Sequence, residues 1–198
     1  MSEVVIVGSG GANLASLQFA LERLGARTHI SSDPGEIAAA PRVILPGVGS
    51  AANAMQRLRA AGLAEPLASL EQPVLGICLG MQLLYQGSAE GSTECLGVLP
   101  GSIEPLSREA GLPVPHMGWN RLAITRADPL LEGVAPGAYV YFVHSYAAAP
   151  SATTLATARY GVDLTAVVRC GNFWGTQFHP ERSAAAGARI LANFLEVH

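Results

Sequence analysis

One thiol lies between two glycines in residues 76–80 (GICLG), at the end of the apolar run 73–77. A strand that turns sharply into a helix at such a residue lifts the side chain clear of the sheet, and bulky flanking residues would crowd the neighbouring backbone. The start of a helix beside a cysteine also favours the thiolate over the thiol. We therefore predict that Cys78 is a nucleophile.

A base for this nucleophile is predicted in residues 179–181 (HPE), which end the expected strand 173–178. Proline biases the residue before it toward extended backbone, and positions i and i+2 of an extended segment project to the same side. Glu181 could then accept a hydrogen bond from one imidazole nitrogen of His179, while the other nitrogen takes a proton from Cys78. The pattern predicts a Cys-His-Glu triad.

An oxyanion site is predicted in residues 45–49 (LPGVG), which leave another expected strand and should reach the same sheet edge as Cys78. Backbone N–H groups of such a turn can face the charge that develops during acyl transfer. The candidate donors are Gly47, Val48, Gly49 and Leu79, the last of which follows the nucleophile directly. Gln82 lies one helical turn after Cys78 on the same face, so we expect it to hold the substrate.

The elements that must position these residues divide the chain into two halves. The first half alternates apolar strands at 4–7, 42–45 and 73–77 with helical patterns between them, the second of which spans 50–61. This order predicts an α/β fold with a mostly parallel sheet flanked by helices, and parallel sheets collect ligands at the carboxyl ends of their strands.

The second half predicts an antiparallel hairpin region followed by a closing helix. The expected strands are 139–146, 155–160, 164–169 and 173–178, joined by short turns. The helix should begin after Ser183, which we expect to act as its N-cap, and should pack back on the sheet. No linker separates the halves, so residues 1–198 are expected to form one domain.

Composition excludes several classes of protein. The net charge is −3 and Lys and Arg form no cluster, so no nucleic-acid partner is expected. No apolar stretch is long enough to span a membrane and no export signal is evident, which favours the cytoplasm. Cys78, Cys95 and Cys170 cannot all pair, so they are expected to be free thiols.

Neither a cofactor nor a metal is expected. Residues 8–11 (GSGG) complete neither a dinucleotide-binding nor a phosphate-binding loop pattern. His29, His116, His144 and His198 are scattered without metal-ligand spacing.

These motifs together resemble the class I, or triad, glutamine amidotransferases. More narrowly, residues 115–120 (PHMGWN), 141–146 (YFVHSY) and 175–183 (GTQFHPERS) resemble the glutaminase subunit of imidazole glycerol phosphate synthase. The resemblance runs the full chain. The Cys and His-x-Glu motifs are specific to the class, while the segment at 115–120 indicates the histidine-pathway member.

The resemblance implies a glutaminase and a partner. Cys78 would form a glutamyl thioester, and the ammonia released would pass to a (β/α)8 cyclase subunit that makes imidazole glycerol phosphate and AICAR in histidine biosynthesis. The glutamine contacts implied are Gln82, Glu90, Ser145 and Tyr146, and the implied contacts with the cyclase, in a heterodimer, are Met117, Trp119 and Asn120. Gly8 departs from the family, whose members often carry Asp at this place.

Other functions fit the same triad. The glutaminase of anthranilate or aminodeoxychorismate synthesis would look nearly identical there, although residues 116–120 argue against it. A stand-alone γ-glutamyl peptidase would need no partner and should turn over glutamyl peptides. A catalytically silent binding module would have no reason to keep Cys78, His179 and Glu181 together.

Overall fold

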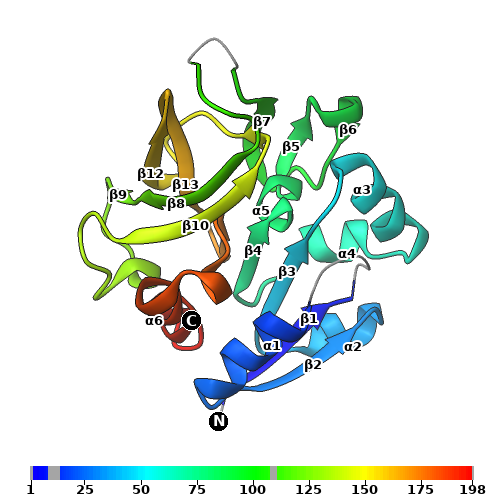
Figure 1. Ribbon diagram of the computed structural model, residues 1–198. Coiled ribbons are helices and arrows are strands. Elements are labelled where there is room, and N and C mark those ends of the chain that lie inside the picture. Colours follow the sequence, from blue (N-terminus) through cyan, green and yellow to red (C-terminus); the bar gives the residue numbers. More distant parts are fainter. Residues whose placement is uncertain (1, 9–13, 108–110, 198) are drawn as a thin grey trace.

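The computed structural model describes residues 2–8, 14–107 and 111–197, and a twisted sheet runs through its centre (Figure 1). The strands of that sheet are β1 (Glu3–Val7), β2 (Arg27–Ser31), β3 (Val43–Gly47), β4 (Val74–Cys78), β9 (Ala123–Ile124), β12 (Thr154–Tyr160), β13 (Val162–Cys170) and β14 (Phe173–Thr176). Their order across the sheet is β2-β1-β3-β4-β14-β13-β12-β9. From β2 to β14 the pairs are parallel, and from β14 to β9 they are antiparallel.

The central strands are apolar because both faces of the sheet are covered. In β1, Val4 and Ile6 pack into one hydrophobic cluster while Val5 and Val7 pack into another, as the period-two alternation of a strand requires. The first cluster lies under α1 (Leu14–Arg23) and α6 (Ala184–Phe194). The opposite face is covered by α2 (Pro34–Ala39), α3 (Ala51–Ala60), α4 (Ala64–Ala68) and α5 (Leu79–Leu83).

Two helices on this second face begin at side-chain caps. Asp33 accepts a hydrogen bond from the N–H of Glu36 at the start of α2, and Ser50 accepts one from Asn53 at the start of α3. Such caps satisfy N–H groups that have no partner within the helix. The two caps therefore determine the residue at which each helix begins.

The late strand β14 joins the two halves of the chain. It pairs in parallel with β4, with Phe173 opposite Val74 and Thr176 opposite Ile77, and antiparallel with β13 on its other side. The carboxyl end of β14 therefore lies beside the carboxyl end of β4. This register brings residues almost a hundred positions apart to the same edge of the sheet.

Two smaller sheets lie beside the central one. The strands β8 (His116–Arg121) and β10 (Tyr139–His144) form a two-stranded antiparallel ribbon, visible at the front of Figure 1. The other sheet contains β5 (Tyr85–Ser88), β6 (Thr93–Glu94), β7 (Leu99–Pro105) and β11 (Tyr146–Ala147). The described residues also form the 3₁₀ turns η1 (Glu90–Ser92), η2 (Pro129–Leu131) and η3 (Pro180–Arg182).

The expected fold class is confirmed, but several details differ. The pair β2–α2 was not predicted, because β2 (RTHIS) is an edge strand whose side chains are mostly exposed and carry no apolar pattern. The apolar run from Leu79 is helical only to Leu83, since Tyr85 begins β5. Ser183 precedes α6 but does not cap it; its hydroxyl donates to the carbonyl of His179 and accepts from the N–H of Tyr141.

Candidate active site

Cys78 occupies a strained turn between β4 and α5. Its backbone has φ 54° and ψ −111°, a positive φ that non-glycine residues rarely adopt. A Cβ at Gly80 would overlap the carbonyl oxygen of Leu45, and one at Gly76 would lie 2.7 Å from the backbone nitrogen of Met81. Glycine on both sides of Cys78 thus lets α5 pack directly against β3 and β4. The turn holds the thiol at the carboxyl end of the parallel strands.

His179 and Glu181 lie together where the chain leaves β14. Nδ1 of His179 is 2.8 Å from Oε1 of Glu181, so the imidazole donates to the carboxylate. Burial lowers the pKa of His179, but hydrogen bonding and charge from Cys78 and Glu181 outweigh it and raise the pKa to about 10. His179 therefore lies between the Cys78 thiol and the Glu181 carboxylate.

The Cys78 sulfur has further polar neighbours from the second half of the chain. The carbonyl oxygen of Val143 lies 3.8 Å from Sγ, and Nε2 of Gln177 lies 3.9 Å from it as a donor. Gln177 is fully buried and lies in the bend between the end of β14 and His179. A thiolate at Cys78 would accept from this amide.

A cavity of about 370 Å³ opens over the thiol. Its lining contains Cys78, His179 and every other residue predicted for the oxyanion site and the glutamine contacts: Gly47, Val48, Gly49, Leu79, Gln82, Glu90, Ser145 and Tyr146. The volume suits a small-molecule ligand. The structure therefore brings the candidate triad and the candidate pocket into one place, and their roles remain a prediction.

Two polar side chains of this cavity, Gln82 and Glu90, already make hydrogen bonds within the protein. Both donors of the Gln82 amide are used, because Nε2 donates to the carbonyl of Tyr146 and to Oε1 of Gln177, each at 2.9 Å. What Gln82 offers a ligand is therefore its Oε1 acceptor. Oε2 of Glu90 accepts from the N–H of Ala51 at 2.7 Å, so this carboxylate also holds the first turn of α3.

The predicted oxyanion segment follows β3, whose last residue, Gly47, lies opposite Cys78 in the register with β4. A Cβ at Gly47 would lie 2.9 Å from the nitrogen of Gly80, so a side chain there would collide with the start of α5. Gly49 has φ 90°, a conformation that favours glycine. These glycines keep the backbone of this loop close to the thiol.

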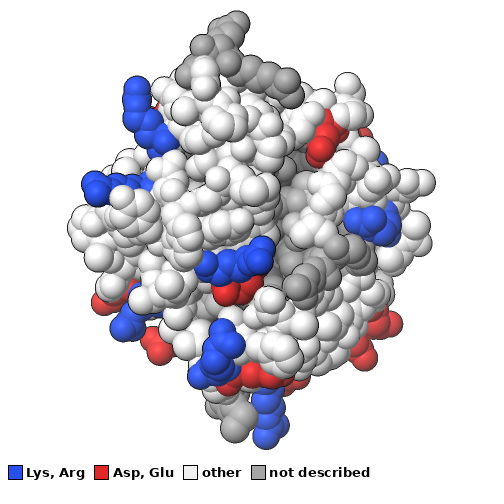
Figure 2. Space-filling view, in the orientation of Figure 1, with Lys and Arg blue, Asp and Glu red and all other residues white. Residues whose placement is uncertain are grey.

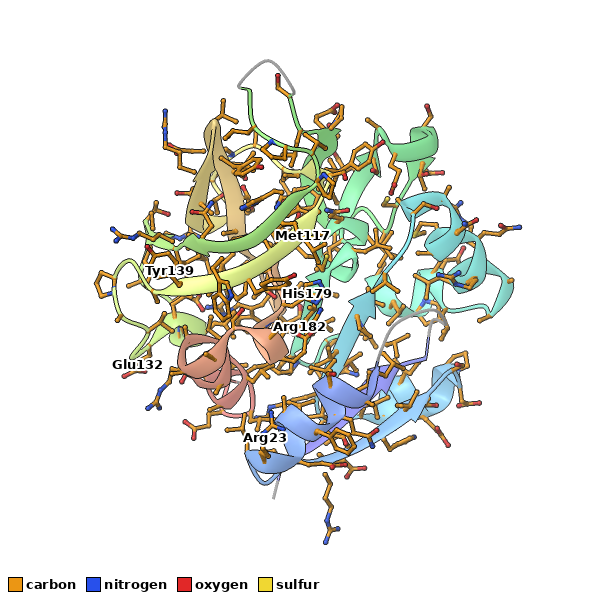
Figure 3. All side chains as sticks on the ribbon, viewed as in Figure 1. Arg23, Met117, Glu132, Tyr139, His179 and Arg182 are labelled. Carbon is orange, nitrogen blue, oxygen red and sulfur yellow. The ribbon has the colours of Figure 1, made fainter. Side chains whose placement is uncertain are left out.

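The predicted partner residues divide between two sides of β8. Met117 and Trp119 are 63% and 53% exposed and lie on the outer side of the ribbon, where Figure 3 shows Met117 close to the front of the molecule. Asn120 projects the other way, because successive residues of a strand alternate. Its amide donates to His116 and to the carbonyl of Arg159. The side chain of Asn120 does not share the exposed face.

Sequence reasoning missed three buried polar residues near the cavity. Gln177 contacts the thiol, and His144 lies in the cavity wall beside Ser145, with its ring hydrogen-bonded to His116. No local pattern marked Gln177, because its partners Gln82 and Cys78 lie 95 and 99 positions away in the chain. The histidines gave no signal, because their spacing fits no metal site and no triad.

Other features of the chain lie apart from this site. Cys95 is buried, and burial raises its pKa to about 11, whereas Cys170 is half-buried. Among residues 2–8, 14–107 and 111–197, no group of three or more His, Cys, Asp and Glu could hold a metal ion. Within the same ranges no helix is long and apolar enough to cross a membrane.

The glycine-rich segment and its neighbours are only partly described. Residues 9–11 of GSGG, and His198, lie outside the described residues. At Gly8, a Cβ would lie 2.8 Å from Oγ of Ser32, which itself donates to the Gly8 carbonyl at 2.8 Å. The serine thus occupies the space that a side chain at this position would need.

Comparison with known proteins agrees with this geometry. The family model described as glutamine amidotransferase class-I matches residues 8–197. The fold is similar to that in the structure of PurLQS from Thermotoga maritima, with a TM-score of 0.76, 18% identity and 98% of each chain covered. The chain belongs to the class I glutamine amidotransferase family.

Relatives with higher sequence identity narrow the family within that class. Over 197 residues the chain is 53% identical to the imidazole glycerol phosphate synthase subunit HisH of Xanthomonas axonopodis pv. citri, covering 100% of this chain and 98% of that protein. The HisH subunit of Xylella fastidiosa matches with the same identity and coverage. The family within the class is that of the HisH subunits.

Proposed function

We propose that this chain is one glutaminase domain, the subunit of a cytoplasmic imidazole glycerol phosphate synthase that hydrolyses glutamine and passes the ammonia to a cyclase subunit. The observation that carries the proposal is the position of His179, between the Cys78 thiol and the Glu181 carboxylate on the wall of a cavity that suits a small ligand. The 53% identity to HisH subunits over the full chain supports the choice of pathway.

In the first half of the reaction, the Cys78 thiolate attacks the side-chain amide carbon of glutamine. Backbone N–H groups of Gly47 to Gly49 and of Leu79 stabilise the oxyanion, a contribution typically worth about 10²–10³ in rate per donor. His179 gives its proton to the leaving nitrogen, so ammonia departs and a glutamyl thioester remains. Glu181 holds the imidazole in the tautomer that this transfer needs.

In the second half, His179 takes a proton from water, which attacks the thioester carbonyl. The carbon–sulfur bond breaks, glutamate is released and the thiolate returns. The Oε1 acceptor of Gln82, the Ser145–Tyr146 segment and Glu90 line the cavity where the rest of the glutamine molecule binds. No metal or cofactor is required for either step.

The ammonia needs an acceptor site, for which we propose a (β/α)8 cyclase subunit docked in a heterodimer. A second cavity of about 160 Å³ lies beside the triad, lined by His179, Glu181, Val143 and Arg182 among others. Val143 lies on β10, and Figure 3 shows Arg182 and Met117 on the same side of the molecule as His179. Ammonia would leave through this side.

The outer surface of the β8–β10 ribbon has the composition of a docking site. Met117, Trp119 and Tyr139 are exposed there, and the area around these strands carries few charged side chains (Figure 2). Exposed aromatic residues and methionine with little charge are typical of interface cores. This exposed surface supports a protein partner at the mouth of the site.

The test is to purify the chain together with the cyclase subunit and to measure imidazole glycerol phosphate formation with glutamine and, separately, with ammonium salts. Both nitrogen sources should support the reaction, and the complex should release glutamate from glutamine. Turnover of γ-glutamyl peptides by the lone chain, or complex formation with an anthranilate-type partner instead, would contradict the proposal.

The docking surface has its own test. Trp119→Ala should raise the dissociation constant of the complex about 10-fold or more, because tryptophan is enriched among the interface residues whose truncation costs about 2 kcal/mol or more. Val162→Ala is the matched control, since Val162 is an equally exposed apolar residue, at 60%, on β13. An equal effect of both substitutions would exclude the ribbon as the docking surface.

A further inference from the structure

A pair of buried histidines, His144 and His116, lies beside the candidate active site. Nδ1 of His144 is 2.9 Å from the carbonyl oxygen of Tyr146, and its Nε2 is 2.9 Å from Nδ1 of His116. Nε2 of His116 is in turn 3.3 Å from Nδ2 of Asn120. The proposed reaction uses neither imidazole.

His144, His116 and Asn120 form a row of hydrogen-bonded side chains. The groups at its two ends, the Tyr146 carbonyl and the Asn120 amide, determine which ring nitrogens carry hydrogen. A carbonyl oxygen can only accept, so Nδ1 of His144 carries the hydrogen, and Nε2 of the neutral ring accepts. His116 must then donate from Nδ1, which leaves its Nε2 to accept from the Asn120 amide. The orientation of that amide is fixed, because Nδ2 donates to the carbonyl of Arg159 at 2.9 Å and Oδ1 accepts from the N–H of Arg121 at 2.8 Å.

Burial keeps both rings neutral, as this arrangement requires. It lowers the pKa of His116 to about 4 and the pKa of His144 to about 4. The His116 ring is also held in place, because it stacks on Phe142 at 4.7 Å and on Tyr160 at 4.0 Å between ring centroids. It cannot turn to another partner without losing both stacks.

The row ends at the nucleophile. The Tyr146 carbonyl that accepts from His144 also accepts from Nε2 of Gln82, which donates in addition to Oε1 of Gln177. Gln177 then donates toward Sγ of Cys78. A continuous series of hydrogen bonds therefore joins Asn120 on β8 to the cavity, and the donor and the acceptor are defined in each of them.

We propose that His116 and His144 are positioning residues that hold the Tyr146 carbonyl, and through it the amides of Gln82 and Gln177, in the arrangement that binds glutamine. The inference rests on the proposed function of the same cavity. The Tyr146 carbonyl is the junction, because it is the acceptor shared by the histidine row and by Gln82. Without His116, the buried Nε2 of His144 loses its donor, and unsatisfied buried acceptors drive rearrangement.

The experiment uses the complex of the chain with the cyclase subunit and four variants. His116→Phe keeps the ring stacking but removes both hydrogen bonds. His116→Asn restores a donor at the position of Nδ1, so it is the conservative variant. Asn120→Ala breaks the outer link at a half-buried position. Thr154→Val breaks a buried 2.9 Å hydrogen bond to Thr165 away from the cavity.

The expected result is a split between KM and kcat. His116→Phe should raise KM for glutamine about 10-fold with kcat changed less than about 3-fold, as loss of ground-state contacts predicts. His116→Asn should recover most of that loss, and Asn120→Ala should raise KM about 2-fold to 3-fold. Thr154→Val should leave KM unchanged, and ammonia-dependent cyclase activity should be unchanged in all four variants.

Two outcomes would overturn the inference while the proposed function stands. One is a wild-type complex that hydrolyses glutamine together with an unchanged KM in both His116→Phe and Asn120→Ala. The other comes from ¹⁵N NMR of the complex at pH 7, where both rings should be neutral with the hydrogen on Nδ1; hydrogen on Nε2 of either ring refutes the row. A wild-type complex that does not use glutamine at all removes the proposed function and this inference with it.

Discussion

Two buried histidines of this protein donate from the same ring nitrogen, yet one is held protonated and the other neutral. His179 and His144 are 9% and 6% exposed, and each uses Nδ1 to donate over 2.8–2.9 Å. The acceptor is the Glu181 carboxylate in the first region and the Tyr146 carbonyl in the second. The pKa of His179 rises to about 10, whereas the pKa of His144 falls to about 4.

The difference shows that burial alone does not decide the charge of a histidine. Burial disfavours the imidazolium in both regions, and hydrogen bonds and charge from Cys78 and Glu181 reverse the balance at His179. A neutral acceptor and a second imidazole cannot do this at His144. A charged ring can transfer a proton, and a neutral ring with fixed hydrogen positions can hold its neighbours in place.

The largest expected effect comes from removing the predicted nucleophile. Cys78→Ala should abolish glutamine hydrolysis, with a loss on the order of 10⁶ in kcat, as when the nucleophile of a triad is removed. It should also lower the pKa of His179, because one of its two charged neighbours is lost. Steady-state glutaminase assays and NMR titration of the His179 ring measure both.

Cys95→Ala is the control for this substitution. Cys95 is buried on the other face of the sheet, and its Sγ approaches only the Thr93 carbonyl, at 3.7 Å, among the described residues. It should lose some stability and keep glutaminase activity. Glutamine turnover in the Cys78 variant would end the assignment of the nucleophile.

Glu181→Gln makes the acceptor of His179 resemble that of His144. The shape is kept but the charge is lost, and kcat should fall by about 10³–10⁴, as expected when the orienting carboxylate of a triad is neutralised. The pKa of His179 should fall toward or below its ordinary value of about 6.5. A variant with nearly full activity and an unchanged His179 titration would show that the carboxylate is not the cause of the contrast.

The effect of Glu181→Gln on the free energy of unfolding should depend on pH in a defined direction. The raised pKa of His179 means that the native state binds more protons than the unfolded state between about pH 6.5 and 10. Its contribution is therefore complete below pH 6.5 and lost as the pH rises through 10. The deficit of Glu181→Gln in unfolding free energy should be roughly 1–2 kcal/mol near pH 6 and should shrink toward pH 10.

The second region should respond to acid in the opposite sense. The pKa values of His116 and His144 lie below those of the unfolded chain, so the unfolded state binds more protons between about pH 4 and 6.5. Stability is present above pH 6.5 and is lost as the pH falls toward 4, by about 3 kcal/mol for each ring. Urea unfolding of wild type and His116→Asn should show a smaller loss in the variant. Equal slopes would mean that these rings are not held neutral.

The smallest effect is expected at an exposed imidazole with a carboxylate partner. Nε2 of His29 lies 3.0 Å from Oε2 of Glu36, and both side chains are about half exposed, at 47% and 56%. Surface ion pairs of this kind contribute little because water screens them. His29→Gln should leave Tm within about 1 °C of wild type by calorimetry. A larger shift would show that a carboxylate partner matters even without burial.

Local rules predicted the parts of the site that one segment determines. The turn at Cys78 follows from its flanking glycines. The contact between His179 and Glu181 was predicted, but its geometry was not: His179 is extended before Pro180, whereas Glu181 lies in the 3₁₀ turn η3 and not in the predicted extended segment. What could not be predicted depends on pairing between distant segments. The parallel insertion of β14 beside β4 and the inward direction of Asn120 are set by sheet register, which one sequence does not specify.

The same limit applies to the buried polar residues. His116, His144 and Gln177 have partners 28 to 99 positions away in the chain, so no local pattern marks them. The edge strand β2 was missed for a different reason, because its exposed residues give no apolar alternation. Prediction from sequence was therefore strongest where a turn determines the chemistry and weakest where tertiary contacts do.

The position of β14 has a consequence for how the enzyme comes to exist in the cell. A nascent chain that has emerged from the ribosome only as far as residue 170 already carries β4, α5 and Cys78, but neither Gln177 nor His179. The gap beside β4 can be filled only by one of the last strands to be synthesised. The predicted nucleophile is therefore left without its predicted base until translation is nearly complete, so an incomplete chain is expected not to hydrolyse glutamine.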